Sequence, residues 1–241
     1  MATTERVRIG FISASGATSP HFEGFRALIP EDVEFDFQGL GLERGHMYVA
    51  EDRAQATMRA AQTVEQHGCQ GIVVSGAPAE VLNPDLQQRL EAAAKVPVAT
   101  AMTACVAALR SFGARRVLLM TPFDADTNQK IRAHLEARSI VAVSPSTAFG
   151  EIDEAMRLTS DEVHALAQAS FAAAGPLDAV YFQGAVLDPL EIMDRLESEF
   201  ACPVVASNPA MLWFILNKAG RTYHIDGCGR LLREWPTPVA P

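Results

Sequence analysis

The sequence lacks the patterns that would indicate a metal site or a disulfide framework. Its four cysteines, Cys69, Cys105, Cys202 and Cys228, are scattered and form no C-x-x-C pair. We therefore expect free thiols rather than disulfides or a zinc site. The six histidines also lack a ligand spacing such as H-E-x-x-H. No protein-held metal is expected.

Runs of basic residues and long apolar segments are absent as well. The 241 residues carry a net charge of −9 with neutral histidines, and Lys and Arg are not clustered. Nucleic-acid binding is disfavoured, because neutralising phosphates requires clustered basic side chains. The apolar run VRIGFIS (7–13) is far shorter than the ~20 residues that span a bilayer. It predicts a first strand rather than a signal peptide. We expect a cytoplasmic protein without a membrane partner.

Glycine-rich phosphate loops are missing too. The stretches GFISASG (10–16) and SGAPAE (75–80) match neither G-x-G-x-x-G nor G-x-x-x-x-G-K-[ST]. No acidic residue stands where a ribose would need one. Nucleotide binding is not expected, and no cofactor is expected.

What the sequence does contain is a regular alternation of short apolar runs and longer helical stretches. Strands that are apolar throughout and separated by helices predict a parallel sheet covered on both faces. The chain is 49% hydrophobic, enough for a large core. The predicted strands are 7–13, 33–40, 71–76, 96–101, 116–122, 178–184 and 202–208, and the predicted helices are 48–67, 84–94, 102–112, 126–137, 160–174, 189–199 and 208–219.

An internal repeat refines this prediction. Residues 67–82 parallel 174–190, and residues 95–113 parallel 201–220, with an offset of roughly 107 residues. The repeat predicts an α/β fold of two pseudo-symmetric doubly wound, flavodoxin-like parallel-sheet lobes with a site in the cleft between them. We expect a first lobe of residues 1–110, with 206–235 packing back onto it, and a second lobe of residues 111–205.

The predicted ligand site lies at the carboxyl ends of the strands, where parallel sheets open into a crevice. The loops after Ser13, Ser75, Thr121, Phe182 and Ala206 are rich in Ser, Thr, Gly, Pro and Asn. Such loops present backbone N–H groups and hydroxyls, which suit a small carboxylate.

Over almost its whole length the chain resembles the aspartate/glutamate racemase superfamily, in the branch of the arylmalonate decarboxylases and maleate isomerases. The most specific stretch is 99–129, ATAMTACVAALRSFGARRVLLMTPFDADTNQ. The other supporting stretches are IGFISASG (9–16), GIVVSGAP (71–78), FGEIDEAMRL (149–158), AVYFQG (179–184) and VVASNPAMLWFILNKAG (204–220).

The resemblance implies that each copy delivers one catalytic residue to opposite faces of the substrate. Racemases and maleate isomerases use a cysteine from each copy, whereas arylmalonate decarboxylases keep one cysteine, in the second copy, and have glycine in the first. The matching positions here are Gly76 and Gln183. A shift of one residue would give Ser75 or Ala77, and Gly184. No register produces a cysteine.

The missing thiols nearly exclude racemisation and maleate-type isomerisation, because an amide is a poor nucleophile without a useful pKa near neutrality. Decarboxylation is less affected. In the family, N–H groups and hydroxyls stabilise the enediolate, and the thiol only protonates the carbanion. Gln183 would bond the substrate while water or another acid delivers the proton. We expect a cofactor-independent, decarboxylase-type lyase acting on a small carboxylic acid. The alternative is a catalytically silent binder of a small carboxylate.

The expected site residues follow from the same resemblance. Two changes weaken the family's oxyanion hole: Pro78 replaces a hydroxyl and an N–H donor, and Phe123 replaces a tyrosine. Relatives range from monomer to dimer and beyond, so a homo-oligomer stays open. Carboxylate oxygens would be held by Ser13, Ser15, Asn128 and the Gly184 and Ala185 amides, with Ser207 and Asn208, and the pocket would also include Tyr48, Ser75, Ala77, Pro78 and Phe123.

Several residues carry a second interpretation. The amide of Gln183 could satisfy buried backbone groups at a strand end instead of contacting a substrate. Cys105 is expected in the core, although it lies near a helix start, where a thiol pKa can fall. Glu80 and Asp188 follow the two glycine turns, where they could form a pair of carboxylates at the site or, in the first turn of a helix, complement the helix dipole. His21 and His46 are loop candidates for a general acid.

Overall fold

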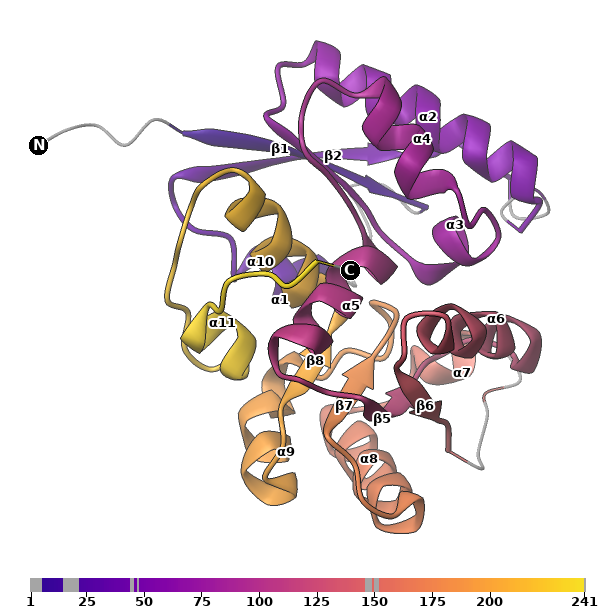
Figure 1. The fold of residues 1–241 in the computed structure, drawn as a ribbon, viewed down its shortest axis with the longest axis vertical. Coiled ribbons are helices and arrows are strands. Elements are labelled where there is room, and N and C mark those ends of the chain that lie inside the picture. Colours follow the sequence, from indigo (N-terminus) through magenta and orange to yellow (C-terminus); the bar gives the residue numbers. More distant parts are fainter. Residues whose placement is uncertain are drawn as a thin grey trace, which may run out of the picture.

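The chain folds into two four-stranded parallel sheets, each flanked by helices (Figure 1). The structure is a computed structural model that describes residues 6–14, 22–43, 46, 48–145, 149 and 152–240. Strands follow the order β2-β1-β3-β4 in one sheet and β6-β5-β7-β8 in the other. Every pairing is parallel. The predicted two-lobe α/β fold is confirmed.

The first sheet contains β1 (Val7–Ser13), β2 (Val33–Gly39), β3 (Gly71–Val74) and β4 (Val98–Thr100), and the second contains β5 (Arg116–Met120), β6 (Val141–Val143), β7 (Ala179–Phe182) and β8 (Val204–Ala206). The helices are α1 (Glu23–Arg26), α2 (Ala50–Gln66), α3 (Ala77–Val81), α4 (Leu86–Ala93), α5 (Ala101–Ser111), α6 (Ala125–Glu136), α7 (Ile152–Ala155), α8 (Ser160–Ala174), α9 (Met193–Phe200), α10 (Ser207–Lys218) and α11 (Arg230–Glu234), with a 3-10 turn at Leu190–Ile192.

The registers bring the carboxyl ends of neighbouring strands level with one another. In the first sheet Val74 pairs with Ile12 on one side and Thr100 on the other. The loops that leave these strands therefore meet at one edge of each sheet. The corresponding row of the second sheet is Met120, Phe182 and Ala206.

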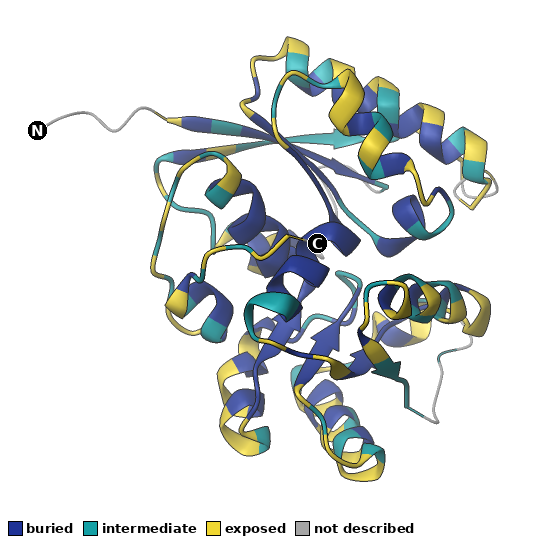
Figure 2. Ribbon diagram, viewed as in Figure 1, coloured by how far each residue is buried: buried dark blue, intermediate teal, exposed yellow. Residues whose placement is uncertain are grey.

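Helices α5 and α10 join the two lobes. Each follows the last strand of its sheet, and the two pack against each other. Residues 101–109 of α5 and 207–216 of α10 are all buried, and both helices lie at the centre of the molecule (Figure 2). One continuous apolar cluster contains Phe11 of the first sheet and Leu118 of the second. The two sheets thus share one core, and a second apolar cluster, which contains Ile72 and Val74, packs on the first sheet.

The short and peripheral elements are the ones that sequence periodicity missed. Strand β6 is an edge strand of three residues, and its first residue, Val141, is exposed. Helix α3 has five residues, and Pro78 stands in its first turn, where a missing N–H costs no helical bond. The predicted strand 178–184 ends at Phe182, which leaves Gln183 and Gly184 in the turn that follows.

Within the described residues, no helix combines the length and apolar character needed to cross a membrane. The same part of the chain contains no cluster of three or more His, Cys, Asp or Glu side chains that could hold a metal ion.

Candidate active site

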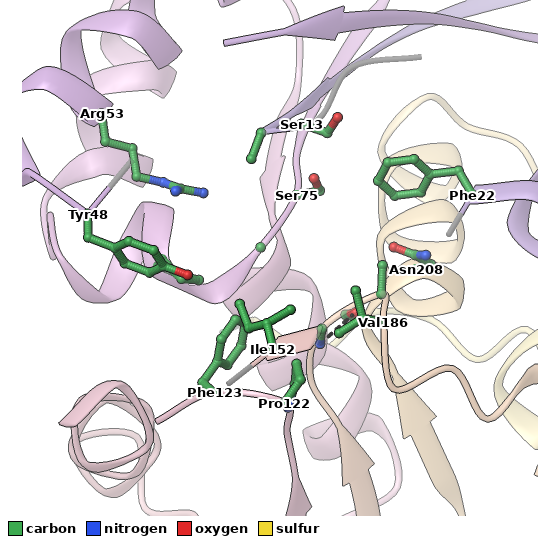
Figure 3. A pocket seen from close by; sticks show the side chains of 16 residues that line it. Ser13, Phe22, Tyr48, Arg53, Ser75, Pro122, Phe123, Ile152, Val186 and Asn208 are labelled. Atoms are coloured by element: carbon green, nitrogen blue, oxygen red, sulfur yellow. Dashed lines mark hydrogen bonds between the residues drawn. The ribbon is translucent and has the colours of Figure 1, made fainter. Parts of the chain in front are cut away.

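A cavity of about 160 Å³ lies at the facing carboxyl ends of the two sheets (Figure 3). It receives residues from the segments directly after β1, β3, β5, β7 and β8, which are the five places that the sequence singled out. Its described lining is Ser13, Ala14, Phe22, Tyr48, Arg53, Ser75, Gly76, Pro78, Pro122, Phe123, Ile152, Gly184, Ala185, Val186, Ser207 and Asn208.

Two glycines occupy equivalent places in the two lobes. Gly76 and Gly184 each come two residues after the end of a central strand, β3 or β7. Both have positive φ, 87° and 112°, a conformation that glycine adopts without the steric cost of a side chain. Both line the cavity. Gly76 of the first lobe therefore corresponds to Gly184 of the second lobe. This is the alternative register, shifted by one residue from the predicted match between Gly76 and Gln183.

Gln183 is not among the residues that line the cavity. Its side chain is fully buried, and its Oε1 accepts a hydrogen bond from the Tyr181 hydroxyl. The same oxygen lies 3.8 Å from the Cys105 Sγ on α5. Residues 181 and 183 point to the same side because side chains alternate along an extended chain. The amide thus faces the core between β7 and α5.

Most of the other predicted site residues do come together. Those that line the cavity are Ser13, Tyr48, Ser75, Gly76, Pro78, Phe123, Gly184, Ala185, Ser207 and Asn208. Ala77 is buried directly behind Gly76 as the first residue of α3. Asn128 lines a neighbouring cavity, and its Nδ2 donates to the Phe123 carbonyl over 2.8 Å. Ser15 and His21 lie outside the described residues.

The two acids after the glycine turns stay out of the cavity lining. Glu80 is buried and accepts hydrogen bonds from Thr100 and Thr103. Its Oε1 lies 3.6 Å from His134 Nε2. Burial raises the pKa of Glu80 and lowers the pKa of His134 to about 4, so both tend toward their neutral forms. Burial also raises the pKa of Asp188 to about 6.

The imidazole of His46 and the thiol of Cys105 have surroundings other than the cavity. His46 is exposed, and its Nδ1 lies 2.7 Å from Asp52 Oδ2. Cys105 is fully buried, and burial raises its pKa to about 12. It therefore belongs to the core, as its alanine-rich helix indicated.

Arg53 is the charged cavity residue that the sequence interpretation missed, and Ala14, Phe22, Pro122, Ile152 and Val186 are lining residues that it also left out. It sits in the first turn of α2 and is only 3% exposed. Burial lowers its pKa to about 10, so the side chain remains a cation at neutral pH. A signal was present: Arg53 shares the buried face of α2 with Thr57, Ala60 and Val64. A charge on an apolar helix face is uncommon unless it is partnered or functional.

The cavity has a polar and an apolar part (Figure 3). Arg53 and Tyr48 approach from one side, and Asn208 from the opposite side, at the start of α10. The N-terminus of that helix carries a partial positive charge. The Gly184 N–H donates to Ser207 Oγ over 3.4 Å. The apolar part is formed by Phe22, Pro122, Phe123, Ile152 and Val186. The site can thus hold an anionic group beside a small apolar one.

Comparison with known proteins agrees with this fold and geometry. This protein belongs to the class of two-lobe α/β proteins in the aspartate/glutamate racemase superfamily. A family model described as arylmalonate decarboxylase matches residues 11–232. The chain belongs to this family.

Individual relatives fall in the same branch. The arylmalonate decarboxylase of Bordetella bronchiseptica is 27% identical over 233 residues, which cover 94% of this chain and 96% of that protein. The maleate isomerase of Nocardia farcinica is 29% identical over 181 residues, or 73% of this chain and 71% of that protein. A solved structure of unliganded arylmalonate decarboxylase has a TM-score of 0.80 at 27% identity, covering 95% of this chain and 99% of that one.

Proposed function

We propose that this protein is a cofactor-independent lyase that decarboxylates a small malonate-type acid. The observation that carries the proposal is the cavity itself, where a cation, serine hydroxyls and a helix N-terminus adjoin an apolar surface. Its volume of about 160 Å³ is close to the ~150 Å³ of an engineered cavity that admits benzene. A group of the size of one benzene ring therefore fits within it.

The proposed reaction separates into two steps. First the bond between the α-carbon and one carboxyl group breaks, CO₂ leaves, and the electron pair stays as an enediolate on the α-carbon and the retained carboxylate. Hydrogen-bond donors aimed at the retained oxygens stabilise this developing charge. The apolar residues destabilise the carboxylate that leaves. The α-carbon then takes up one proton.

No thiol in the described lining can supply that proton. The hydroxyl of Tyr48 is the lining group whose chemistry best suits a proton donor, directly or through water. The space beside Gly76 supports a reacting position that solvent can reach, whereas Pro122 and Phe123 occupy the corresponding space beside Gly184. A contact between Gln183 and the substrate stays a prediction.

The test is incubation with malonate, methylmalonate and phenylmalonate in D₂O, followed by NMR. A decarboxylase yields CO₂ and the corresponding monoacid with deuterium at the α-carbon. We expect Tyr48→Phe to lower kcat at least about tenfold, because general acid catalysis typically contributes ~10²–10⁴-fold. Tyr223→Phe is the matched control, because Tyr223 bonds Asp32 and does not line the cavity. Full turnover in Tyr48→Phe would remove the tyrosine from the mechanism.

A second function, carboxylate binding without catalysis, is favoured by the residue types of the described lining. None of the described residues around the cavity is a cysteine, histidine, lysine or carboxylic acid. A catalytically silent carboxylate binder would need none of them. Such a protein would be stabilised thermally by its ligand without forming product, which separates it from the lyase in the same incubation.

A further inference from the structure

Arg53 has an unusual position for a charged side chain. It projects from the first turn of α2 toward the cavity (Figure 3) and is nearly inaccessible to solvent. Removing a guanidinium from water is unfavourable unless an anion or hydrogen-bond acceptors replace the lost hydration. Solvent screens a buried charge only weakly, so an anion that enters the cavity is attracted to Arg53 alongside the interactions that this residue already makes.

The surroundings determine which kind of group can approach. Arg53 is the one charged side chain in the described lining, so the cavity has a positive centre in a protein of net charge −9. A Cβ added to Gly76 would lie 3.5 Å from Arg53 Nη2. The missing side chain leaves open the space directly in front of the guanidinium. Asn208 and the start of α10 lie across the cavity, so they can contact a different part of the same ligand.

We propose that Arg53 determines the ligand specificity of the cavity by binding an anionic group beside Gly76. Its planar guanidinium offers parallel N–H donors that match the two oxygens of a carboxylate. A neutral group of the same shape gains neither the charge attraction nor these charge-assisted hydrogen bonds. This inference rests on the proposed function only in taking the ligand to be a small carboxylate.

The experiment measures binding rather than turnover, so the two proposals can fail separately. Its probes are benzylphosphonate and benzylsulfonamide, which have similar shapes but differ in charge, and neither can lose CO₂. We expect the wild type to bind benzylphosphonate about tenfold more tightly or better, in line with hydrogen bonds to charged groups. Arg53→Met should remove this preference and leave the affinity for benzylsulfonamide nearly unchanged. Arg53→Lys should retain part of it.

Two further variants make the result specific. Arg59→Met removes a charge from the exposed face of the same helix and should leave both affinities unchanged. Gly76→Ala keeps the guanidinium but fills the space before it, so it should weaken benzylphosphonate selectively even if Arg53→Met does not fold.

Each outcome supports or contradicts the proposed role of Arg53. A wild type without a preference for benzylphosphonate overturns the role of Arg53, as does a preference that survives both Arg53→Met and Gly76→Ala. Loss of the preference in these variants supports the role even if no malonate is turned over, in which case only the lyase proposal fails. If Arg53→Met turns over malonates as fast as the wild type and still prefers benzylphosphonate, the proposed role of Arg53 is contradicted. The lyase proposal then stands.

Discussion

The hydroxyl of Tyr181 donates a hydrogen bond to the side-chain oxygen of Gln183, two residues further along the chain. Both side chains are buried, and both face α5, where the Tyr181 hydroxyl also lies 3.6 Å from Met102 Sδ. The pair therefore links the central strand of the second sheet to a helix that follows the first.

This pair predicts a structural cost for changing Gln183. Gln183→Leu leaves the Tyr181 hydroxyl buried without its acceptor, which should lower the free energy of unfolding by ~1–3 kcal/mol. Tyr181→Phe removes the donor, and the double variant should recover part of the loss. Urea denaturation of the four proteins measures the coupling in a double-mutant cycle.

The competing prediction is that Gln183 contacts the substrate. Gln183→Ala would then reduce turnover at least about tenfold, and Tyr181→Phe in the same chain would not restore it. Additive stabilities in the cycle, together with that loss of turnover, would contradict the structural role.

A cysteine at Gly76 should be unusually reactive. Gly76→Cys would place its Cβ 3.5 Å from Arg53 Nη2, and a neighbouring cation favours the thiolate. We expect the new thiol to have a pKa below the ordinary ~8.5 and to react with iodoacetamide at neutral pH. The positive φ of 87° should cost ~1–3 kcal/mol of stability for a residue with a side chain. The pH dependence of the alkylation rate measures the thiol pKa.

The native thiols provide the control for this variant. All four native cysteines are buried, and burial raises the pKa of Cys69 and Cys202 to about 11. The wild type should therefore react slowly until it is unfolded. If Arg53→Met leaves the pKa of the introduced thiol unchanged, the guanidinium is not the cause of its reactivity.

Asp188 should make stability depend on pH. Burial raises its pKa to about 6 in the folded protein, against ~3.9 in an unfolded chain. The protonated carboxyl is the favoured folded form, so its contribution to stability is complete below about pH 4 and is lost as the pH rises through 6. Asp188→Asn is neutral throughout, and the Leu190 N–H that donates to Asp188 Oδ1 over 3.0 Å keeps an acceptor.

We therefore expect Asp188→Asn to gain ~1–3 kcal/mol relative to the wild type between pH 4 and pH 7.5. Urea denaturation at four pH values across this range measures the difference. Asp85→Asn, at an exposed position, should follow the wild type. A difference between Asp188→Asn and the wild type that does not change with pH would contradict the shifted pKa.

The regular parts of the fold could be predicted from sequence because their cause is local. The strand 7–13 and the helix 160–174 were predicted with the bounds that the structure has. A continuous apolar run specifies a buried strand, and Thr159 with Glu162 forms a capping box that starts α8. Edge strand β6 and short helix α3 depend on neighbours far along the chain, which periodicity does not reveal.

The candidate site was predictable in its loops but less so in its side chains. Glycine turns after apolar strands indicated the edge where the cavity lies. The direction of Gln183 depends on where β7 ends, and an error of one residue turns a side chain to the opposite face. Arg53 comes from a helix rather than a strand end, so a search restricted to the loops passed over it.

The contact between α5 and α10 limits how a ligand can enter. These helices and both sheets share one core. A hinge motion that separated the lobes would therefore expose apolar surface, and the binding of a single ligand could not offset that free-energy cost. Exchange with solvent must then depend on smaller displacements at the mouth of the cavity, where Tyr48 is already 48% exposed. The shared core would then keep the two glycine turns at a constant separation while a ligand enters or leaves.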